Sequence, residues 1–321
     1  MRGGTGGSAG SRARGGAAVR ERLLLGPVLI AALLGALWFD EWLAGRATPS
    51  LLAGALGMTL PAGVLVLPVM LIAAVLAARE LTAFFRSKSA GVSAWVMGVA
   101  PVFGLLAWAA GLAIGGAAGV ALLPACGVVV LVLAMLEQAG RRNSEGALAA
   151  TGGAVLSFAY LGLAFGFLLA IRAEHSAWVL LWVLLVAKSC DIGAYFTGKS
   201  MGRHKLIPWL SPGKTWEGLG GGVLMSAAVG AGGLAMLRAW AGVDTPPWWL
   251  GAACGGVFGL VGQAGDLAES MMKRDAGMKD SGSSLPGFGG MLDVLDSPIF
   301  VAPVAYGALA ALRAGGWMGS V

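Results

Sequence analysis

The sequence predicts an all-α protein, an integral membrane bundle of about nine transmembrane helices. Two observations carry this prediction. Hydrophobic residues make up 57% of the 321 positions and charged residues only 12%, whereas soluble globular domains have about 25% charged residues. Apolar runs also recur along the chain, and about 20 apolar residues cross a hydrocarbon core of about 30 Å. The composition therefore excludes an ordinary soluble domain.

The apolar runs place the helices in order. They lie at residues 23–39, 62–78, 94–113, 117–136, 150–171, 177–197, 219–237, 249–265 and 298–315. A further apolar patch at 40–61 is expected to be re-entrant or a short interfacial helix. Residues 1–20 are expected to form a disordered basic cytoplasmic tail, because they are rich in Gly, Ser, Ala and Arg. Many of the 54 glycines fall inside the runs, where small residues let membrane helices approach closely.

The basic residues predict the orientation. Among the loops, one side holds only Arg46, Arg172, Arg238 and Arg313, while most of the 22 Lys and Arg residues fall at the N-terminus and on the other side. Cytoplasmic loops carry the excess of Lys and Arg, so we expect a multi-pass protein of the cytoplasmic (inner) membrane with a cytoplasmic N-terminus. After the tail, we divide the chain into N-terminal helices, 21–175, and a C-terminal catalytic region, 176–321. No basic stripe interleaves with aromatic residues, which argues against nucleic acid as a partner.

One segment departs from the composition of the rest. Between residues 266 and 297 lie six of the sixteen Asp and Glu residues. A charged side chain at the centre of a membrane helix costs roughly 2.5–3.5 kcal/mol on insertion scales. A chain that concentrates carboxylates between two apolar spans is therefore expected to hold something cationic there, on the cytoplasmic side.

The spacing of these carboxylates narrows the candidates. Asp266, Glu269, Ser270 and Lys273 stand at i, i+3, i+4 and i+7, so they share one face if the preceding span continues as a helix. Asp293 and Asp296, also three apart, are expected to point the same way from another helical turn, and we single out Asp266, Asp293 and Asp296 as metal ligands. Carboxylates without His or Cys suit Mg²⁺ rather than zinc.

Phosphate is the second component that the segment indicates. Lys273, Arg274 and Lys279 lie among the carboxylates, with Asp280 beside them. The loop at 281–290 is rich in glycine, including Gly289 and Gly290, whose amides are free to face phosphate oxygens. The combination favours metal-assisted phosphoryl or nucleotidyl transfer. The plainer alternative is a salt-bridged juxtamembrane loop.

Two more polar groups fall on the predicted cytoplasmic side. Lys188 and Asp191 stand three apart in an apolar run, either as a structural ion pair or in a functional role. The following loop reaches from Gly202 to Gly218 and holds four candidate substrate-binding residues. They are Ser211, Lys214, Thr215 and Glu217.

At these residues the chain resembles the phosphatidate cytidylyltransferases, the CDP-diacylglycerol synthases. The first matching motif is Asp191, Gly193-Ala194-Tyr195-Phe196 and Gly198, followed by Ser211-Pro212 and Lys214-Thr215-Trp216-Glu217-Gly218. The second runs through Ser270, Lys273-Arg274, Lys279-Asp280, Gly282, Leu285-Pro286-Gly287, Gly289-Gly290, Asp293 and Asp296-Ser297. The resemblance is strong over residues 185–300. The first half of the chain shares only its apolar character with the family.

The resemblance implies a reaction and a site. CTP and phosphatidic acid would give CDP-diacylglycerol and pyrophosphate in a polar cavity open to the cytoplasm and the lipid leaflet. Residues matching Asp266, Asp293 and Asp296 would hold Mg²⁺ and a second cation such as K⁺. Residues matching Ser211, Lys214 and Thr215 would form part of the site. Such glycine-rich bundles often pair, so a homodimer is a candidate assembly.

The chain departs from the family pattern at Phe288, where His is common, and at Val294, where Arg is common; Gly213 also replaces a common Lys. Because every carboxylate remains, we expect retained catalysis, with His204, Arg203 or Lys205 as candidate substitutes for the missing groups. The alternatives are a CTP-dependent lipid kinase of the polyprenol or phytol type, an ion-coupled transporter with Lys188 and Asp191 as a relay, and an inactive scaffold.

Overall fold

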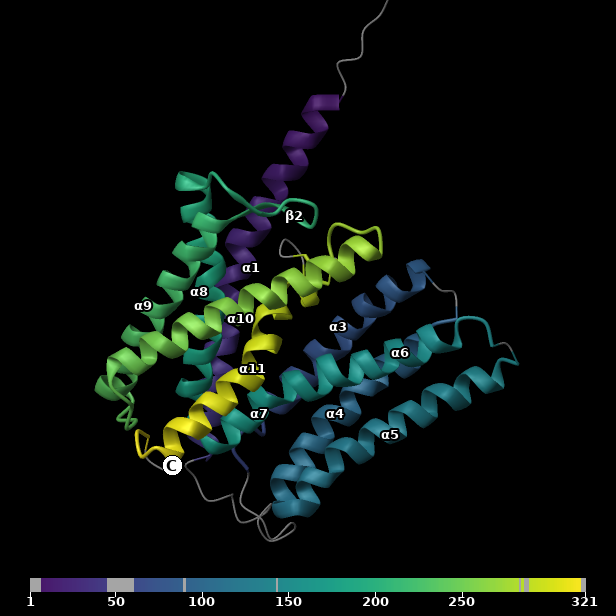
Figure 1. Ribbon diagram of the computed structural model, residues 1–321, viewed down its shortest axis with the longest axis horizontal. Coiled ribbons are helices and arrows are strands. Elements are labelled where there is room, and N and C mark those ends of the chain that lie inside the picture. Colours follow the sequence, from purple (N-terminus) through teal and green to yellow (C-terminus); the bar gives the residue numbers. More distant parts are fainter. Residues whose placement is uncertain are drawn as a thin grey trace, which may run out of the picture.

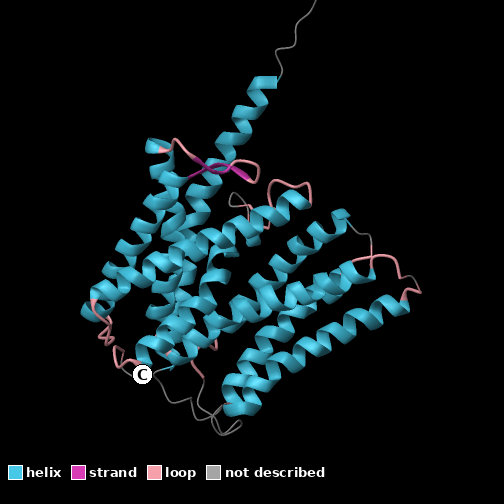
Figure 2. Cartoon of the chain, viewed as in Figure 1, coloured by secondary structure: helices cyan, strands magenta, loops and turns pink. Residues whose placement is uncertain are grey.

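The computed structural model describes residues 7–44, 61–88, 91–142, 144–282, 284–285 and 289–318. Within them the chain is a helical bundle with one small hairpin (Figures 1 and 2). The helices are α1 (Gly7–Ala44), α3 (Val66–Lys88), α4 (Ala94–Ile114), α5 (Gly116–Gly140), α6 (Ala147–Ser157), the π-helix η1 (Phe158–Ala164), α7 (Phe165–Glu174), α8 (Ala177–Met201), α9 (Trp216–Trp240), α10 (Trp248–Asp275) and α11 (Met291–Ala314).

The predicted all-α membrane fold is confirmed. Eight segments of the described chain are long and apolar enough to cross a membrane, and α6, η1 and α7 together make one of them, Ala147–Glu174. At the ninth predicted position, α10 is a helix of 28 residues. It is less apolar than the others because its last turns carry the charged residues of the acidic segment.

Two expectations differ from the structure. The tail expected to be disordered over 1–20 is helical from Gly7 onward, where α1 begins; its Ala and Arg residues are good helix formers. The loop expected at 202–218 contains an antiparallel hairpin of β1 (Lys205–Ile207) and β2 (Ser211–Thr215), with Lys205 opposite Thr215. The patch at 40–61 lies mostly outside the described residues.

Glycine sets how closely the C-terminal helices pack, as the sequence predicted. A Cβ added at Gly193 on α8 would lie 2.6 Å from Met225 Cβ on α9, and one at Gly230 on α9 would lie 3.0 Å from Gly255 Cα on α10. Helices that touch at such positions bring their backbones into contact. The order of packing is therefore α8 on α9, α9 on α10 and α10 on α11.

Helix α11 joins the two halves of the bundle. It contacts α8 and α10 on one side and α3, η1 and α7 on the other. Its side chains Leu292 and Ile299 are fully buried. The polar groups that α11 carries in its first turns are thus held inside the protein rather than against lipid.

A buried ion pair fixes the opposite end of the bundle. Arg172 Nε on α7 lies 2.6 Å from Asp40 Oδ2 on α1, and neither side chain is more than 3% exposed. The same carboxylate accepts hydrogen bonds from the backbone N–H groups of Gly63 and Leu65. This cluster ties α1 and the start of α3 to α7, far along the helices from the acidic segment.

Candidate active site

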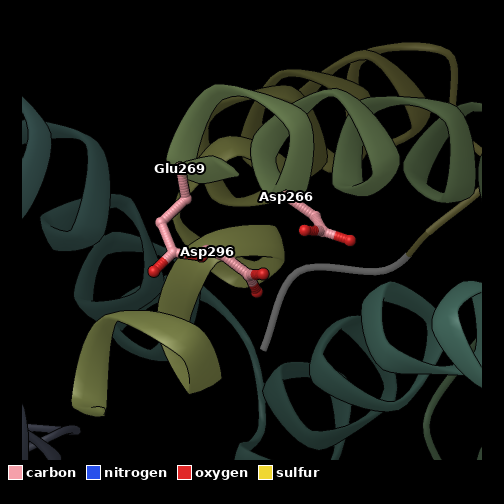
Figure 3. A group of neighbouring side chains, drawn as sticks. All are labelled: Asp266, Glu269 and Asp296. Carbon is pink, nitrogen blue, oxygen red and sulfur yellow. The ribbon is translucent and has the colours of Figure 1, made fainter. Parts of the chain in front are cut away.

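Helices α10 and α11 bring three carboxylates together. Asp266 and Glu269 project from adjacent turns of α10, and Asp296 faces them from α11 (Figure 3). One oxygen of each lies within 4.8 Å of the others. Such close carboxylates repel one another unless a cation lies between or beside them.

Two lysines from other elements contact this group. Lys188 Nζ on α8 lies 2.7 Å from Asp296 Oδ1 and 3.5 Å from Asp191 Oδ2. The predicted i, i+3 pair of Lys188 and Asp191 is therefore confirmed, but its shorter contact is to α11. Lys214 Nζ at the end of β2 lies 2.6 Å from Asp266 Oδ2, without hydrogen-bond geometry.

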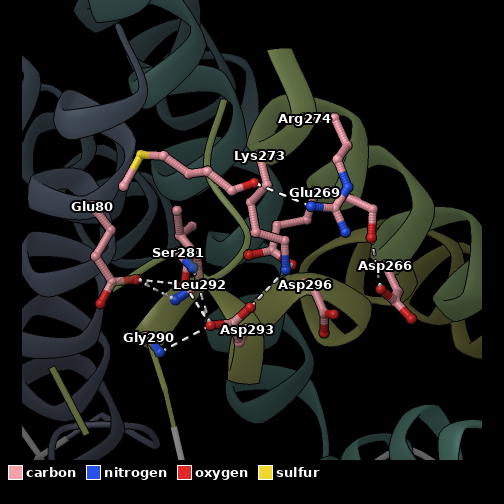
Figure 4. Close-up of polar contacts among 12 residues, drawn as sticks. Glu80, Asp266, Glu269, Lys273, Arg274, Ser281, Gly290, Leu292, Asp293 and Asp296 are labelled. Carbon is pink, nitrogen blue, oxygen red and sulfur yellow. Dashed lines mark hydrogen bonds and ion pairs between the residues drawn. The ribbon is translucent and has the colours of Figure 1, made fainter. Parts of the chain in front are cut away.

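A third lysine joins the group to Asp293. Lys273 Nζ lies 2.7 Å from both Glu269 Oε2 and Asp293 Oδ1 (Figure 4). The predicted common face of α10 is confirmed, because Ser270 Oγ also donates to Asp266 Oδ1 at 3.4 Å. The structure therefore brings Asp266 and Asp296 together with Glu269, and places Asp293 behind Lys273.

The charges of this connected cluster do not balance. It holds five carboxylates, those of Asp191, Asp266, Glu269, Asp293 and Asp296, and three lysines. With all eight groups ionised, two negative charges remain. Glu269 is fully buried, and its Oε1 has no hydrogen-bond partner in the described chain. A buried carboxylate oxygen without a partner is unfavourable, so a divalent cation fits this cluster in both charge and donor type.

A cavity of about 390 Å³ adjoins the cluster. Its walls come from α8, β2, α9 and α10 and include Asp191, Lys199, Lys214, Gln263 and Asp266. Lysine ammonium groups bind phosphate as point charges, and the two acids connect the cavity to the carboxylate cluster. The cavity is thus suited to an anionic ligand that also meets a cation.

The β1–β2 hairpin positions Lys214 in that wall. Thr215 is the N-cap of α9 and accepts a hydrogen bond from Gly218 N at 3.0 Å. Glu217 accepts the backbone N–H groups of Arg203 and His204 and lies 2.6 Å from His204 Nδ1. Thr215 and Glu217, both predicted to bind substrate, therefore make contacts that stabilise the hairpin and its junction with α9. Ser211 begins β2, opposite Ile207.

The glycine-rich loop is fixed both by Asp293 on α11 and by Glu80 on α3, outside the C-terminal region. Asp293 Oδ2 accepts from Ser281 Oγ at 2.7 Å and from Gly290 N at 2.9 Å (Figure 4). Gly289 has φ +95°, a conformation that favours glycine. Glu80 on α3 contacts the same segment.

Other predicted residues lie apart from the cluster. Arg274 donates to Leu210 O and Met278 O, which ties the end of α10 to the hairpin. Lys279 and Asp280 are exposed and make no hydrogen bond or ion pair with any described residue. Phe288 lies outside the described residues.

Sequence reasoning missed three residues. Glu269 stood on the same face as Asp266 in the sequence, but Asp293 was preferred as the third ligand. Glu80 had a signal too, as a carboxylate inside the apolar run of α3. Gln263, which lines the cavity and donates to Asp266 at 3.3 Å, had none.

Comparisons with known proteins identify the family. Residues 45–312 match the sequence model of the cytidylyltransferase family. A phosphatidate cytidylyltransferase of Staphylococcus aureus (strain COL) is 44% identical over 151 residues, 47% of this chain and 55% of that protein. One from Staphylococcus saprophyticus is 42% identical over the same lengths. The uncharacterized protein YnbB of Escherichia coli (strain K12) is 43% identical over 150 residues, 41% of this chain and 47% of YnbB. The chain thus spans about half the length of the curated relatives it matches.

Proposed function

The chain belongs to the cytidylyltransferase family, and on that premise we propose that it transfers the cytidylyl group of CTP to phosphatidate. A phosphate oxygen of phosphatidate attacks the α-phosphorus of CTP. The bond from that phosphorus to the bridging oxygen of the β-phosphate breaks, and pyrophosphate leaves. The products are CDP-diacylglycerol and pyrophosphate.

One observation carries this proposal. A cluster that carries two excess negative charges when all its groups are ionised adjoins a cavity whose wall presents Lys199 and Lys214. Triphosphates are bound in proteins by a divalent cation together with basic side chains. The cavity offers the basic side chains, the adjoining cluster offers oxygen ligands for such a cation, and the names of the relatives supply the nucleotide and the lipid.

Mg²⁺ would be held by Asp266, Glu269 and Asp296. These residues fit it because their oxygens lie close together and Glu269 Oε1 has no partner among the described residues. When bound, the ion neutralises charge on the phosphates and on the leaving pyrophosphate. Asp293 as a direct ligand remains a prediction. So does K⁺ as a second cation; between Asp296 and Asp191 this chain already has the ammonium of Lys188.

The lysines have separate roles in this proposal. Among the described residues, Lys214 forms an ion pair with Asp266 alone, so its ammonium can turn to a phosphate in the cavity. Lys199 stands in the same wall and can bind a second phosphate. Lys273 is held by two carboxylates and positions them instead. The attacking phosphate is already largely ionised near neutral pH, so no strong general base is needed. On this proposal, Phe288 in place of the family's common His does not prevent catalysis.

The excess of basic residues in one set of loops supports a cytoplasmic active site. Roles in phosphate binding for Arg274, Lys279 and Asp280 remain predictions, as does a homodimer.

The deciding experiment measures products from the purified protein with phosphatidate, Mg²⁺ and each nucleoside triphosphate in turn. Release of pyrophosphate with CTP supports the proposal. Release of CDP with a phosphorylated lipid alcohol would instead identify a lipid kinase, and ion flux without nucleotide turnover a transporter.

The matched variants lie on one helix. Asp266→Asn is expected to abolish turnover, whereas Asp275→Asn, an exposed change at the end of α10, should leave it unchanged. Equal activity of the two variants would contradict the assignment of the site.

A further inference from the structure

Glu80 is a buried carboxylate in the middle of an apolar helix. It lies on α3 with 5% of its surface exposed. It accepts hydrogen bonds from Met291 N at 2.8 Å and Leu292 N at 2.9 Å. It also accepts from the hydroxyl of Ser284, and Ser281 Oγ lies 3.2 Å from its Oε2. All these partners are more than 200 residues away in the sequence.

These contacts cap α11. The first N–H groups of a helix have no partner within the helix, and the residue before α11 is Gly290, which has no side chain to supply one. The carboxylate of Glu80 takes the N–H groups of the first two helical residues, and a negative charge is favourable at that end of a helix. A residue of α3 therefore fixes where α11 begins.

The glycines of the loop make room for this contact. A Cβ added at Gly282 would lie 2.9 Å from Glu80 Cγ, and one at Gly290 would lie 2.5 Å from Glu80 Oε2. Any larger residue at either position would push the loop off Glu80. The loop and the carboxylate thus form one closely fitted unit.

The unit connects to the carboxylate cluster through named contacts. Ser281 Oγ lies 3.2 Å from Glu80 Oε2 and 2.7 Å from Asp293 Oδ2. The hydroxyl has one proton, and the shorter contact assigns it to Asp293. Asp293 holds Lys273, which holds Glu269. Figure 4 shows this chain running from α3 to α10.

We propose that Glu80 is a positioning residue for the carboxylate cluster: by capping α11 from α3, it sets the rotation and height at which Asp293 and Asp296 meet α10. This rests on the proposed function only in taking that cluster as the cation site. Glu80 itself does not touch the cavity. Its effect is transmitted by the first turns of α11, because Asp293 directly follows the capped Leu292 and Asp296 lies about one turn further on.

The test compares Glu80→Ala and Glu80→Gln with Glu174→Gln. Glu174 is the matched control because it anchors the far end of the same helix, accepting from Tyr306 at 2.7 Å and Arg313 at 3.4 Å. Binding of Mn²⁺, followed by electron paramagnetic resonance, reports on the cation site without substrate. Replacing a residue that orients metal ligands typically lowers the metal affinity about 10–100-fold.

We expect Glu80→Ala to weaken Mn²⁺ binding about 10–100-fold and to speed amide exchange at Met291 and Leu292. Glu80→Gln should lie between wild type and Glu80→Ala, because its carbonyl can still accept one N–H. Glu174→Gln should leave the Mn²⁺ affinity unchanged. In turnover, Glu80→Gln should lower kcat and leave the KM for phosphatidate near that of wild type.

Ser281→Ala keeps the cap but removes the link to Asp293, so a smaller loss of Mn²⁺ affinity is expected. Wild-type Mn²⁺ affinity in both Glu80 variants would overturn the proposal and leave Glu80 a stabilising cap. A wild-type protein that binds no Mn²⁺ would overturn it as well. If instead the wild type binds Mn²⁺ in a Glu80-dependent way but releases no pyrophosphate, the proposed function fails and the role of Glu80 stands.

Discussion

Replacing Lys188 with Met tests how much the ion pairs of this lysine with Asp296 and Asp191 stabilise the folded protein. The ammonium lies 2.7 Å from Asp296 and 3.5 Å from Asp191. At an effective dielectric constant of about 20, these distances correspond to about 6 and about 5 kcal/mol of gross attraction. Desolvation of the three charges offsets much of this.

The net effect is dominated by the acid left behind. Removing one partner of a buried ion pair costs about 3–5 kcal/mol, because the other charge stays buried and unpaired. The side chain of Asp296 is 7% exposed and that of Lys188 34%. The remaining exposure of Lys188 places the expected loss at the lower end, about 3 kcal/mol.

Mg²⁺ should compensate this loss. Without Lys188 the cluster carries three excess negative charges instead of two, so a divalent cation binds the folded variant more strongly than the folded wild type. A ligand present at 100 times its Kd stabilises the folded state by about 2.7 kcal/mol. We therefore expect Mg²⁺ to raise the apparent unfolding temperature of Lys188→Met more than that of the wild type.

The free thiols provide the assay. Cys190 is buried, and Cys126 and Cys254 are partly buried, so a thiol-reactive dye reports unfolding in detergent as they become accessible. The control is Lys88→Met, whose pair with Asp275 spans 3.6 Å and is largely exposed; such pairs contribute about 0–1 kcal/mol. Equal destabilisation of the two variants, or an equal response to Mg²⁺ in Lys188→Met and wild type, would refute the reasoning.

Three further variants separate the parts of the structure. Glu269→Gln should lower pyrophosphate release by at least about 100-fold, and Asp293→Asn by about 10–100-fold. A larger loss in Asp293→Asn than in Glu269→Gln would favour Asp293 as the direct ligand. Near-wild-type turnover of Asp293→Asn would remove Asp293 from the site. Gly193→Ala should destabilise the α8–α9 contact by about 1–3 kcal/mol in thermal unfolding, and a neutral effect would mean that the helices can separate without loss. Arg172→Leu should cost about 3–5 kcal/mol by leaving Asp40 buried and unpaired, with unchanged turnover per folded molecule; a loss of turnover at full stability would connect that end of the bundle to the site.

The sequence predicts the helices well because a membrane helix is marked by local composition. The apolar runs correspond to the observed spans, and the common face of Asp266, Glu269, Ser270 and Lys273 follows from helical periodicity alone. The pairing of Lys188 with Asp191 is local too. All of these relations lie within one helix.

The relations that the sequence leaves undecided, or does not show, lie between helices. Whether Asp293 or Glu269 joins Asp266 and Asp296 depends on the rotation of α11 against α10, which no local pattern encodes. The contact of Glu80 with Leu292 crosses 212 residues. The hairpin at 205–215 also escaped prediction, because its pairing and the Glu217 contacts that close it are tertiary features.

Glycine connects the composition of the chain to its chemistry. A Cβ at Gly265 on α10 would lie 2.5 Å from Asp296 O on α11, and one at Gly262 would lie 3.3 Å from Ser297 Cβ. A larger residue at Gly265 would move α11 away from α10 and separate Asp266 from Asp296. The close packing expected of glycine in a membrane helix is therefore also what brings carboxylates from two helices within reach of one cation. In this segment the structural and the functional interpretations of glycine are the same: the bundle packs closely where it concentrates negative charge, and three lysines contact the carboxylates there.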